Sequence, residues 1–179
     1  MILAVDVQYS ETKAFVAGVL FSSWQDEKES SDYLAVVSDI EEYEPGSFYK
    51  RELPCILALL KKHQLKPETI VVDGYVYLDV DGKPGLGKRL YDSLDGKIKI
   101  VGVAKKAFVG INEEFGIYRG KSSKPLYVTA TFCPEKAREC IVSMYGENRI
   151  PVLLKRADRL CREAANKSSK RDAASGAPS

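Results

Sequence analysis

The sequence predicts an α/β domain in which helices pack on a mixed β-sheet. Two apolar, β-rich runs separated by a turn-like tetrapeptide predict a hairpin at the start of the chain. Further along, short apolar strands alternate with segments whose apolar residues recur at helical spacing. A chain of 179 residues with 45% hydrophobic residues is long enough for one full core and too short for us to expect two.

The first three expected strands belong to one group. Ile2–Tyr9 and Ala14–Phe21 are apolar and flank the turn Ser10–Lys13. A third β-rich run, Tyr33–Val37, lies within residues 24–44, a stretch with eight acidic residues and one basic residue. Such acidity is typical of a solvated loop and a sheet edge.

The rest of the chain to residue 165 alternates strands and helices. The helical segments carry apolar residues three and four positions apart, and one of them begins with a proline, which suits a first helical turn. A crossover helix is expected between two parallel strands. We expect helices over Pro54–His63, from Leu86, and over Pro134–Tyr145 and Val152–Ala165, and strands over Thr69–Asp73, Lys97–Ala104 and Leu126–Thr129.

Residues 1–165 are expected to form a single domain, followed by a tail. From Asn166 the chain reads NKSSKRDAASGAPS, which offers no large apolar side chain for burial. We therefore predict that residues 166–179 form a disordered basic C-terminal tail.

Composition and charge disfavour several classes of protein. The 27 basic and 25 acidic residues leave a formal net charge of +2, so any surface that binds nucleic acid must be local. Apolar runs fall far short of the roughly 20 residues that span a bilayer. Because the N-terminus has no basic leader, we expect a soluble, unexported cytoplasmic protein, and we favour a monomer. Four cysteines without a CxxC pair and a single histidine, His63, disfavour a zinc site.

Ionisable residues interrupt or end three of the expected strands. Asp6 lies within the apolar run Ile2–Val7, Asp73 ends a second run, and Lys105 follows a third. A buried carboxylate is costly unless it is paired or binds a metal. If the strands of Asp6 and Asp73 are neighbours, a divalent cation would relieve the repulsion between them, and oxygen ligands favour Mg²⁺ or Mn²⁺. Taken singly, an aspartate before a glycine is often a turn former, and a lysine at a strand end is usually solvated.

Several short sequence words become informative when they are taken together. They are VDVQY (Val5–Tyr9), YEPG (Tyr43–Gly46), FYKRELP (Phe48–Pro54), VVDG (Val71–Gly74), VGVAK (Val101–Lys105), KPLYV (Lys124–Val128), RIP (Arg149–Pro151) and ADR (Ala157–Arg159). In this order and approximate spacing they resemble the endonuclease V family, over residues 1 to about 165. The ordered set is specific, although no single word in it would be.

The resemblance implies a ribonuclease-H-like fold and a magnesium-dependent endonuclease that acts in nucleic-acid repair or processing. Family members hydrolyse the second phosphodiester bond on the 3′ side of hypoxanthine in DNA or RNA. By matching positions, Asp6, Glu52 and Asp73 would hold the metal, with Mn²⁺ as a possible substitute for Mg²⁺. Lys105 would lie near the scissile phosphate, and Asp158 would complete the catalytic set.

The resemblance also assigns a substrate-binding loop. In the family the Y-x-P-G word inserts as a wedge at the damaged base, which gives this role to Tyr43, Pro45 and Gly46. An aromatic or proline wedge can offset part of the cost of unstacking a base. Local excesses of positive charge, +5 in residues 97–125 and +4 from residue 155 onward, could add a phosphate-binding face.

Three departures from the family pattern concern substrate recognition. Family members usually carry a helical extension before the first strand, whereas this chain begins almost on the strand itself. Bulky residues at Tyr75–Asp79 replace a Gly-rich segment that lines the base pocket, and Thr131 and Phe132 replace a Gly-His pair. We therefore expect an intact metal site with altered base recognition.

Two other functions remain open from the sequence. One is a non-catalytic or substrate-altered relative that binds nucleic acid and keeps the carboxylates as residual features. The other is an α/β enzyme that handles small phosphorylated molecules with the same carboxylates. The second has less support, because the chain has no GxxxxGK[ST] phosphate loop.

Overall fold

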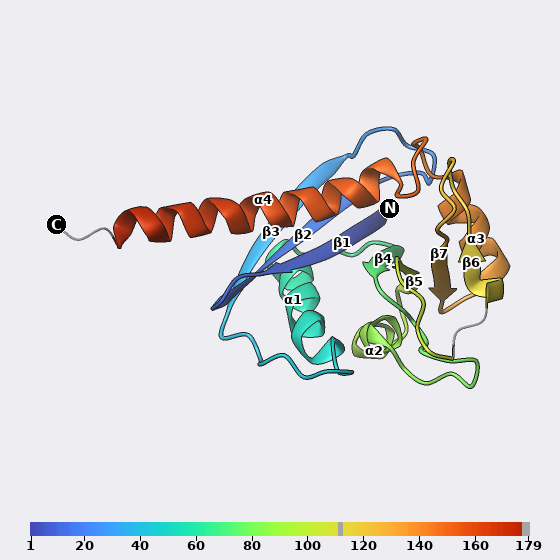
Figure 1. Cartoon of the computed structure of the whole chain (residues 1–179), viewed down its shortest axis with the longest axis horizontal. Coiled ribbons are helices and arrows are strands. Elements are labelled where there is room, and N and C mark those ends of the chain that lie inside the picture. Colours follow the sequence, from blue (N-terminus) through green and yellow to red (C-terminus); the bar gives the residue numbers. More distant parts are fainter. Residues whose placement is uncertain (111–112, 177–179) are drawn as a thin grey trace.

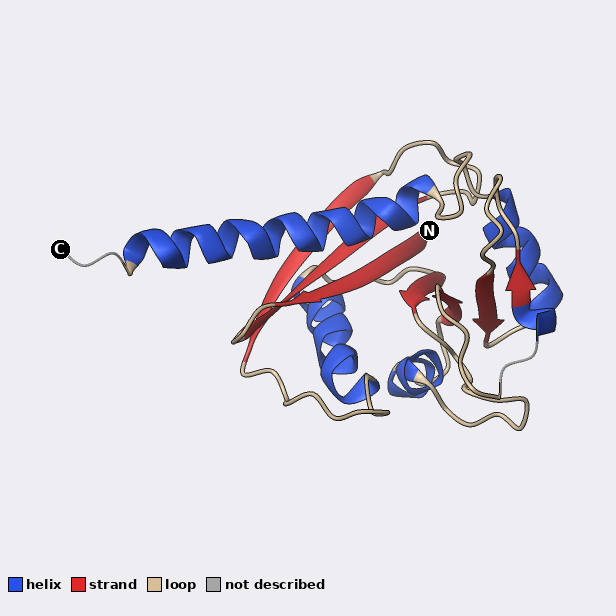
Figure 2. Cartoon of the chain, in the orientation of Figure 1, coloured by secondary structure: helices blue, strands red, loops and turns tan. Residues whose placement is uncertain are grey.

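The protein is represented by a computed structural model that describes residues 1–110 and 113–176. In this part of the chain a seven-stranded mixed sheet has the strand order β3-β2-β1-β4-β5-β7-β6 (Figures 1 and 2). The predicted α/β architecture is confirmed. The strands are β1 (Ile2–Tyr9), β2 (Lys13–Phe21), β3 (Ser31–Ser38), β4 (Thr69–Asp73), β5 (Lys99–Ala104), β6 (Gly116–Ile117) and β7 (Leu126–Ala130).

Helices cover both faces of the sheet (Figure 2). Buried residues of α1 and α2 join one hydrophobic cluster, and those of α3 and α4 join another on the opposite face. None of the helices in the described residues is long and apolar enough to cross a membrane. The helices are α1 (Tyr49–Lys62), α2 (Leu86–Ser93), α3 (Pro134–Ser143) and α4 (Val152–Ser175), with a short 3₁₀ turn at Glu113–Phe115.

Alternation along β1 explains how one strand serves two cores. Ile2 and Ala4 pack in the cluster on the α3 and α4 side, whereas Leu3 and Val5 pack in the cluster on the α1 and α2 side. Successive side chains of a strand point to opposite faces of the sheet. Because helices cover both faces here, every side chain of a central strand is buried, and the strand is apolar at each position. The strand becomes only half-buried from Asp6 onward, where it reaches the sheet edge.

Three central strands run in the same direction. β1 pairs with β4, and β4 pairs with β5, both in parallel, while the predicted hairpin of β1 and β2 is antiparallel. The carboxyl ends of β1, β4 and β5 therefore meet at one edge of the sheet. In open α/β sheets this edge is where ligands commonly bind.

The tail prediction is wrong over most of its length. α4 continues through Ser175, so residues 166–175 are helical rather than disordered, while residues 177–179 lie outside the described part. Forming the first turn is the costly step in a helix. The packed residues of α4, which end at Ala165, meet that cost, and the alanine- and lysine-containing extension then propagates with favourable helix propensity.

α1 begins five residues earlier than predicted, at Tyr49 rather than Pro54. The backbone N–H groups of Arg51 and Glu52 both donate to the carbonyl of Phe48, at 3.1 and 3.2 Å, and close the first turn. Pro54 lies inside the helix, where its missing N–H removes one bond near the start. Glu52 therefore lies in the first turn of α1 instead of before the helix.

Candidate active site

Strand register brings two of the predicted carboxylates together. β1 and β4 are neighbours with Ala4 opposite Val71. The pairing of the two strands ends there, and Asp6 and Asp73 each follow two residues further along, at the same end of the sheet. Because the period of a strand is two residues, both side chains lie on the face to which Ala4 and Val71 contribute, the one that α4 covers. The condition set by the sequence, that these strands be neighbours, is met.

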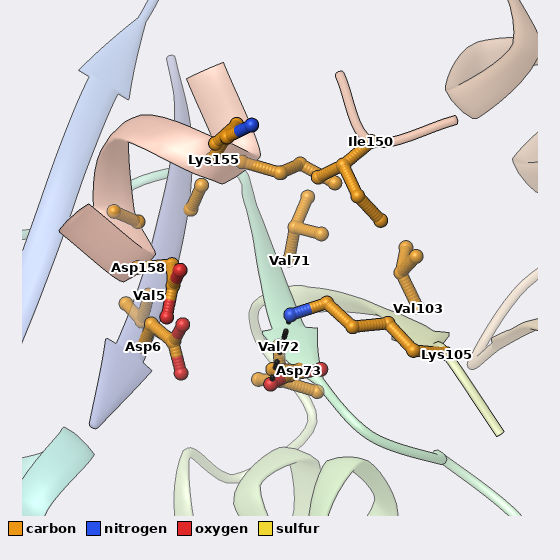
Figure 3. Close-up of a pocket in the computed structure, with 13 residues that line it drawn as sticks. Val5, Asp6, Val71, Val72, Asp73, Val103, Lys105, Ile150, Lys155 and Asp158 are labelled. Atoms are coloured by element: carbon orange, nitrogen blue, oxygen red, sulfur yellow. Dashed lines mark ion pairs between the residues drawn. The ribbon is translucent and has the colours of Figure 1, made fainter. Parts of the chain in front are cut away.

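The end of β4 and the end of β5 place a lysine beside Asp73. Gly74 has a φ of +145°, which favours glycine, and the chain turns out of the strand there. Lys105 follows directly after β5, and its Nζ lies 3.9 Å from Oδ2 of Asp73 (Figure 3). The two side chains are 43% and 42% exposed, so this ion pair is accessible to solvent and to a ligand.

α4 closes the pocket from the other side. Asp158 projects from its first half toward Asp6, Lys155 lines the pocket one turn earlier, and Ile150 adds an apolar wall (Figure 3). The Asp158 carboxylate accepts a hydrogen bond from Arg162 of the next turn at 3.0 Å. The pocket thus gathers charged side chains from β1, β4, α4 and the end of β5, which lie far apart in the sequence.

Glu52 approaches the same group from the opposite side of the sheet. It is half-buried in the first turn of α1 and does not line the pocket itself. The negative charges of Asp73 and Asp6 nevertheless act on it, and its own charge acts on Tyr9. Of the five predicted catalytic residues, four surround one pocket and the fifth lies within electrostatic range.

Burial and the charges of neighbouring carboxylates raise the pKa values of Asp6, Glu52 and Asp73. Burial, followed by the charge of Asp73, raises the pKa of Asp6 to about 7. The Val7 N–H donates to Oδ1 of Asp6 at 2.9 Å and opposes this rise, because it stabilises the charged carboxylate. Burial, followed by Asp73 and then Asp6, raises the pKa of Glu52 to about 8. Burial also raises the pKa of Asp73, although Lys105 opposes that shift. Such perturbed groups clustered in one cleft are typical of functional sites.

The chemistry of this donor set fits a hard divalent cation, although its geometry is not that of a finished site. After burial, the charge of Asp73 raises the pKa values of both Asp6 and Glu52, and a cation would relieve that repulsion. Among the described residues, however, no three His, Cys, Asp or Glu side chains are arranged closely enough to hold a metal ion.

Arg149 is a site residue that the sequence reasoning missed. Its Nη2 donates to the carbonyl of Lys105 at 2.5 Å and to the carbonyl of Pro125 at 2.7 Å. The guanidinium therefore ties the segment after β5 to the start of β7 and fixes the backbone that carries Lys105. The RIP word contained this residue, but only a three-dimensional contact could reveal its role.

The predicted wedge residues lie on a separate exposed loop before α1. Tyr43 is 52% exposed and contacts Phe48, itself 58% exposed, with ring centroids 5.4 Å apart. Gly46 has a φ of +80°, so the Pro45–Gly46 turn requires glycine at this position. Arg51 lies with its guanidinium carbon 5.9 Å from the Tyr43 ring centre and 3.9 Å from that of Tyr9. The loop thus presents two aromatic rings to solvent, next to the helix turn that carries Glu52.

In the segment after Asp73, the side chain of Tyr75 is packed into the fold. Tyr75 is only 8% exposed, donates its hydroxyl to the carbonyl of Lys106 at 2.6 Å, and packs near Phe108. This bulky residue fills space directly beyond the Gly74 turn. The altered segment identified in the sequence is therefore a packed part of the fold.

Comparisons with known proteins agree with this architecture. A family model described as Endonuclease V matches residues 1–129. The curated endonuclease V of Streptomyces avermitilis is 30% identical over 143 residues, which cover 68% of this chain and 61% of that protein. The chain thus spans about three fifths of the length of this relative. The matched family region contains Asp6, Glu52, Asp73 and Lys105, whereas Asp158 lies beyond it.

Solved structures show the same fold. The crystal structure of endonuclease V from Streptomyces avermitilis has a TM-score of 0.72 and 26% identity, and the match covers 94% of this chain and 82% of that one. Endonuclease V from Ciona intestinalis, in complex with a 24mer DNA that contains an inosine followed by a ribo-adenosine, has a TM-score of 0.78 at 20% identity. That match covers 93% of this chain and 86% of the other.

Proposed function

The chain belongs to the endonuclease V family, and on this premise we propose that it is a metal-dependent endonuclease that hydrolyses a phosphodiester bond near a deaminated base such as hypoxanthine. The observation that carries this proposal is the meeting of Asp6, Asp73, Lys105 and Asp158 around one pocket at the carboxyl ends of parallel strands. Acidic and basic groups held together in this way suit phosphodiester hydrolysis, which needs both charge neutralisation and an oriented nucleophile.

The carboxylates have the first role. Asp6, Glu52 and Asp73 would hold Mg²⁺, or Mn²⁺ in its place, after deprotonation. The bound ion would supply Lewis-acid stabilisation of the reacting phosphate. Asp6 and Glu52 give up protons more readily when that positive charge is present, because their raised pKa values reflect burial and mutual repulsion.

Lys105 and Asp158 act on opposite sides of the pocket. The ammonium group of Lys105 is half-exposed and can pair with a phosphate oxygen of the substrate in place of Asp73. Asp158 faces Asp6 from α4 and can accept a hydrogen bond from a water molecule between them (Figure 3). Arg149 fixes the backbone of Lys105, so the ammonium group starts from a defined position.

The aromatic loop supplies the contact with bases. Tyr43, supported by Phe48 and by the Pro45–Gly46 turn, can stack against or separate bases of a DNA or RNA strand that contains inosine. Because Tyr75 fills the segment beyond Gly74, we propose that the dependence on inosine is weaker than the dependence on metal.

Cleavage of end-labelled DNA and RNA, single-stranded and duplex, with and without one inosine, tests this proposal. Mg²⁺-dependent cutting that EDTA abolishes is the expected result. A cut one nucleotide beyond inosine would support both the proposed reaction and the proposed base preference. Equal cutting with and without inosine would support the reaction and contradict the base preference. Cutting that persists in EDTA would contradict the metal-dependent reaction.

A second function, a nucleic-acid-binding relative without catalysis, is favoured by one observation. The described side chains do not form a group of three ligands close enough for a metal. Salt-sensitive binding to these probes, without cleavage in Mg²⁺ or Mn²⁺, would establish this alternative and reject the endonuclease.

A further inference from the structure

The second half of α4 extends beyond the body of the protein. Its last buried residue is Ala165, and the helix continues from there to Ser175 (Figures 1 and 2). We refer to residues 166–175 as the α4 arm. Nine of its ten residues are exposed, and the other, Ser168, is half-buried. The arm projects past the β1–β2 hairpin and contributes almost nothing to the core.

Positive charge is concentrated on one side of this arm. Lys167, Lys170 and Arg171 are spaced by three and four residues, which places them on one face of a helix. Among the described residues none of the three has an ion-pair partner. The arginines closer to the core differ, because Arg156 pairs with Asp32, and Arg162 pairs with the Asp158 carboxylate. More of the unneutralised charge of α4 therefore lies on the arm than on its packed half.

A second element adds charge to the same place. Lys13, the first residue of β2, lines a groove together with Lys167 and Arg171. This groove has a volume of about 410 Å³, and its floor includes the apolar side chains of Leu34 and Val36 on β3. Asp172 is the one acidic residue among those that line it. Three cations from two separate segments thus converge on a single groove.

The arm lies within reach of a substrate held at the pocket. Twelve residues separate Asp158 from Lys170, which corresponds to about 18 Å at the rise of an α-helix. That distance matches roughly five base pairs of a duplex, at about 3.4 Å for each phosphate along one strand. Lys155, which lines the pocket and has no ion-pair partner among the described residues, lies at the start of the same helix.

We propose that the α4 arm and Lys13 form an accessory site for the phosphate backbone of the nucleic acid that flanks the bond to be cut. This inference rests on the proposed function. The partner is a polyanion because the free charges around this groove are cationic and come from two separate segments. A second copy of the chain fits this surface less well, because two such arms would repel each other.

Binding measured without cleavage tests the accessory site. The probe is a fluorescein-labelled 30-base-pair DNA duplex with one inosine, in EDTA, at several salt concentrations. The K167A/K170A/R171A variant should reduce the salt slope by about 2.7, so that raising salt from about 50 to about 200 mM weakens the wild type roughly 40-fold more than the variant. Lys13→Ala, on a different element, should reduce the slope by about 1.

A matched control removes the same charge elsewhere. Lys61, Lys66 and Lys97 are exposed and lie toward the opposite edge of the sheet, where α1 ends and β4 and β5 begin. The K61A/K66A/K97A variant should keep the wild-type salt slope. Alanine has a high helix propensity, so circular dichroism should show unchanged helix content in the arm variant.

Three results would overturn the accessory site. They are an unchanged slope in the arm variant, an equal reduction in the control variant, and sedimentation showing that the arm variant converts a dimer of the wild type into a monomer. Cleavage by the wild type in Mg²⁺ is measured separately on the same duplex. A protein that binds through the arm without cutting would reject the proposed function alone, whereas a protein that cuts with an unchanged slope in the arm variant would reject the accessory site alone.

Discussion

The pocket and the α4 arm both concentrate charge, but they do so in different ways. The pocket collects Asp6, Asp73, Lys105 and Asp158 from four separated segments, and only the folded sheet brings them together. The arm carries its charges within ten consecutive residues of one helix. Charged groups of the pocket also shift the pKa values of Asp6 and Asp73, whereas none of the arm cations has an ion-pair partner among the described residues.

This difference predicts two kinds of response to mutation. Groups that interact strongly in one network give large, non-additive effects when one of them is removed. Phosphate-binding cations along a helix act almost independently, and each contributes a modest share. The pocket should therefore behave as a unit, and the following experiments test that expectation from the largest effect to the smallest.

Asp73→Asn should have the largest effect on cleavage. The amide keeps the size of the side chain and removes the charge that the proposed metal site needs, so the rate should fall by about 100- to 1,000-fold or more. Asp81→Asn, an exposed change in the following loop, is the control and should keep wild-type activity. A rate within about ten-fold of wild type would show that Asp73 acts outside the catalytic unit.

Arg149→Ala should have the next largest effect. It removes two hydrogen bonds that hold the backbone at Lys105 and Pro125, and loss of such supporting contacts costs about 10- to 100-fold in activity. Arg149→Lys should recover part of this rate. When kcat and substrate affinity are measured separately, kcat should fall by the larger factor. The reason is that the substitution displaces Lys105 but does not remove a contact with the substrate. Equal loss in Arg138→Ala, which breaks an exposed ion pair on α3, would reject this positioning role.

The sequence predicted the parts of the site that depend on strand order. Asp6 and Asp73 stood out because a carboxylate at the end of an apolar strand is unusual, and parallel neighbours bring such ends together. Glu52 and Asp158 carried no comparable signal, since acidic residues are ordinary in a first helical turn and on a solvated helix face. Their assignment depended on the family resemblance alone.

The role of Arg149 and the helical structure of the α4 arm could not be predicted from the local sequence pattern. Arg149 acts through backbone carbonyls that lie 24 and 44 residues away, and no sequence period encodes such a contact. The α4 arm was expected to be disordered because it lacks apolar residues, but that rule describes segments that must fold alone. A helix already anchored by its packed first half needs no further burial to continue.

Tyr43→Ala should have a smaller effect that depends on the substrate. Loss of one stacking ring should weaken the use of duplex DNA by about ten-fold, in line with the 1–3 kcal/mol that a base–aromatic stack contributes. Single-stranded DNA, which needs no separation, should be affected less. Tyr145→Ala, at another exposed tyrosine, should change neither substrate. An equal loss on both substrates would assign Tyr43 to general binding instead of strand separation.

The smallest effect concerns stability without metal. The folded-state pKa values of Asp6 and Glu52, about 7 and about 8, lie above the unfolded values of 3.8 and 4.5. The folded protein therefore binds more protons than the unfolded chain between about pH 4 and pH 8, and these two groups destabilise it increasingly as pH rises through that range. In EDTA, Asp6→Asn should be more stable than the wild type at pH 8, by an amount on the order of 1 kcal/mol, and this difference should shrink toward pH 5. Mg²⁺ should raise the wild-type melting temperature more at pH 8 than at pH 5, and Asp6→Asn should lose most of that response. A difference between the two proteins that does not change with pH would show that the pKa of Asp6 is not raised in the folded protein.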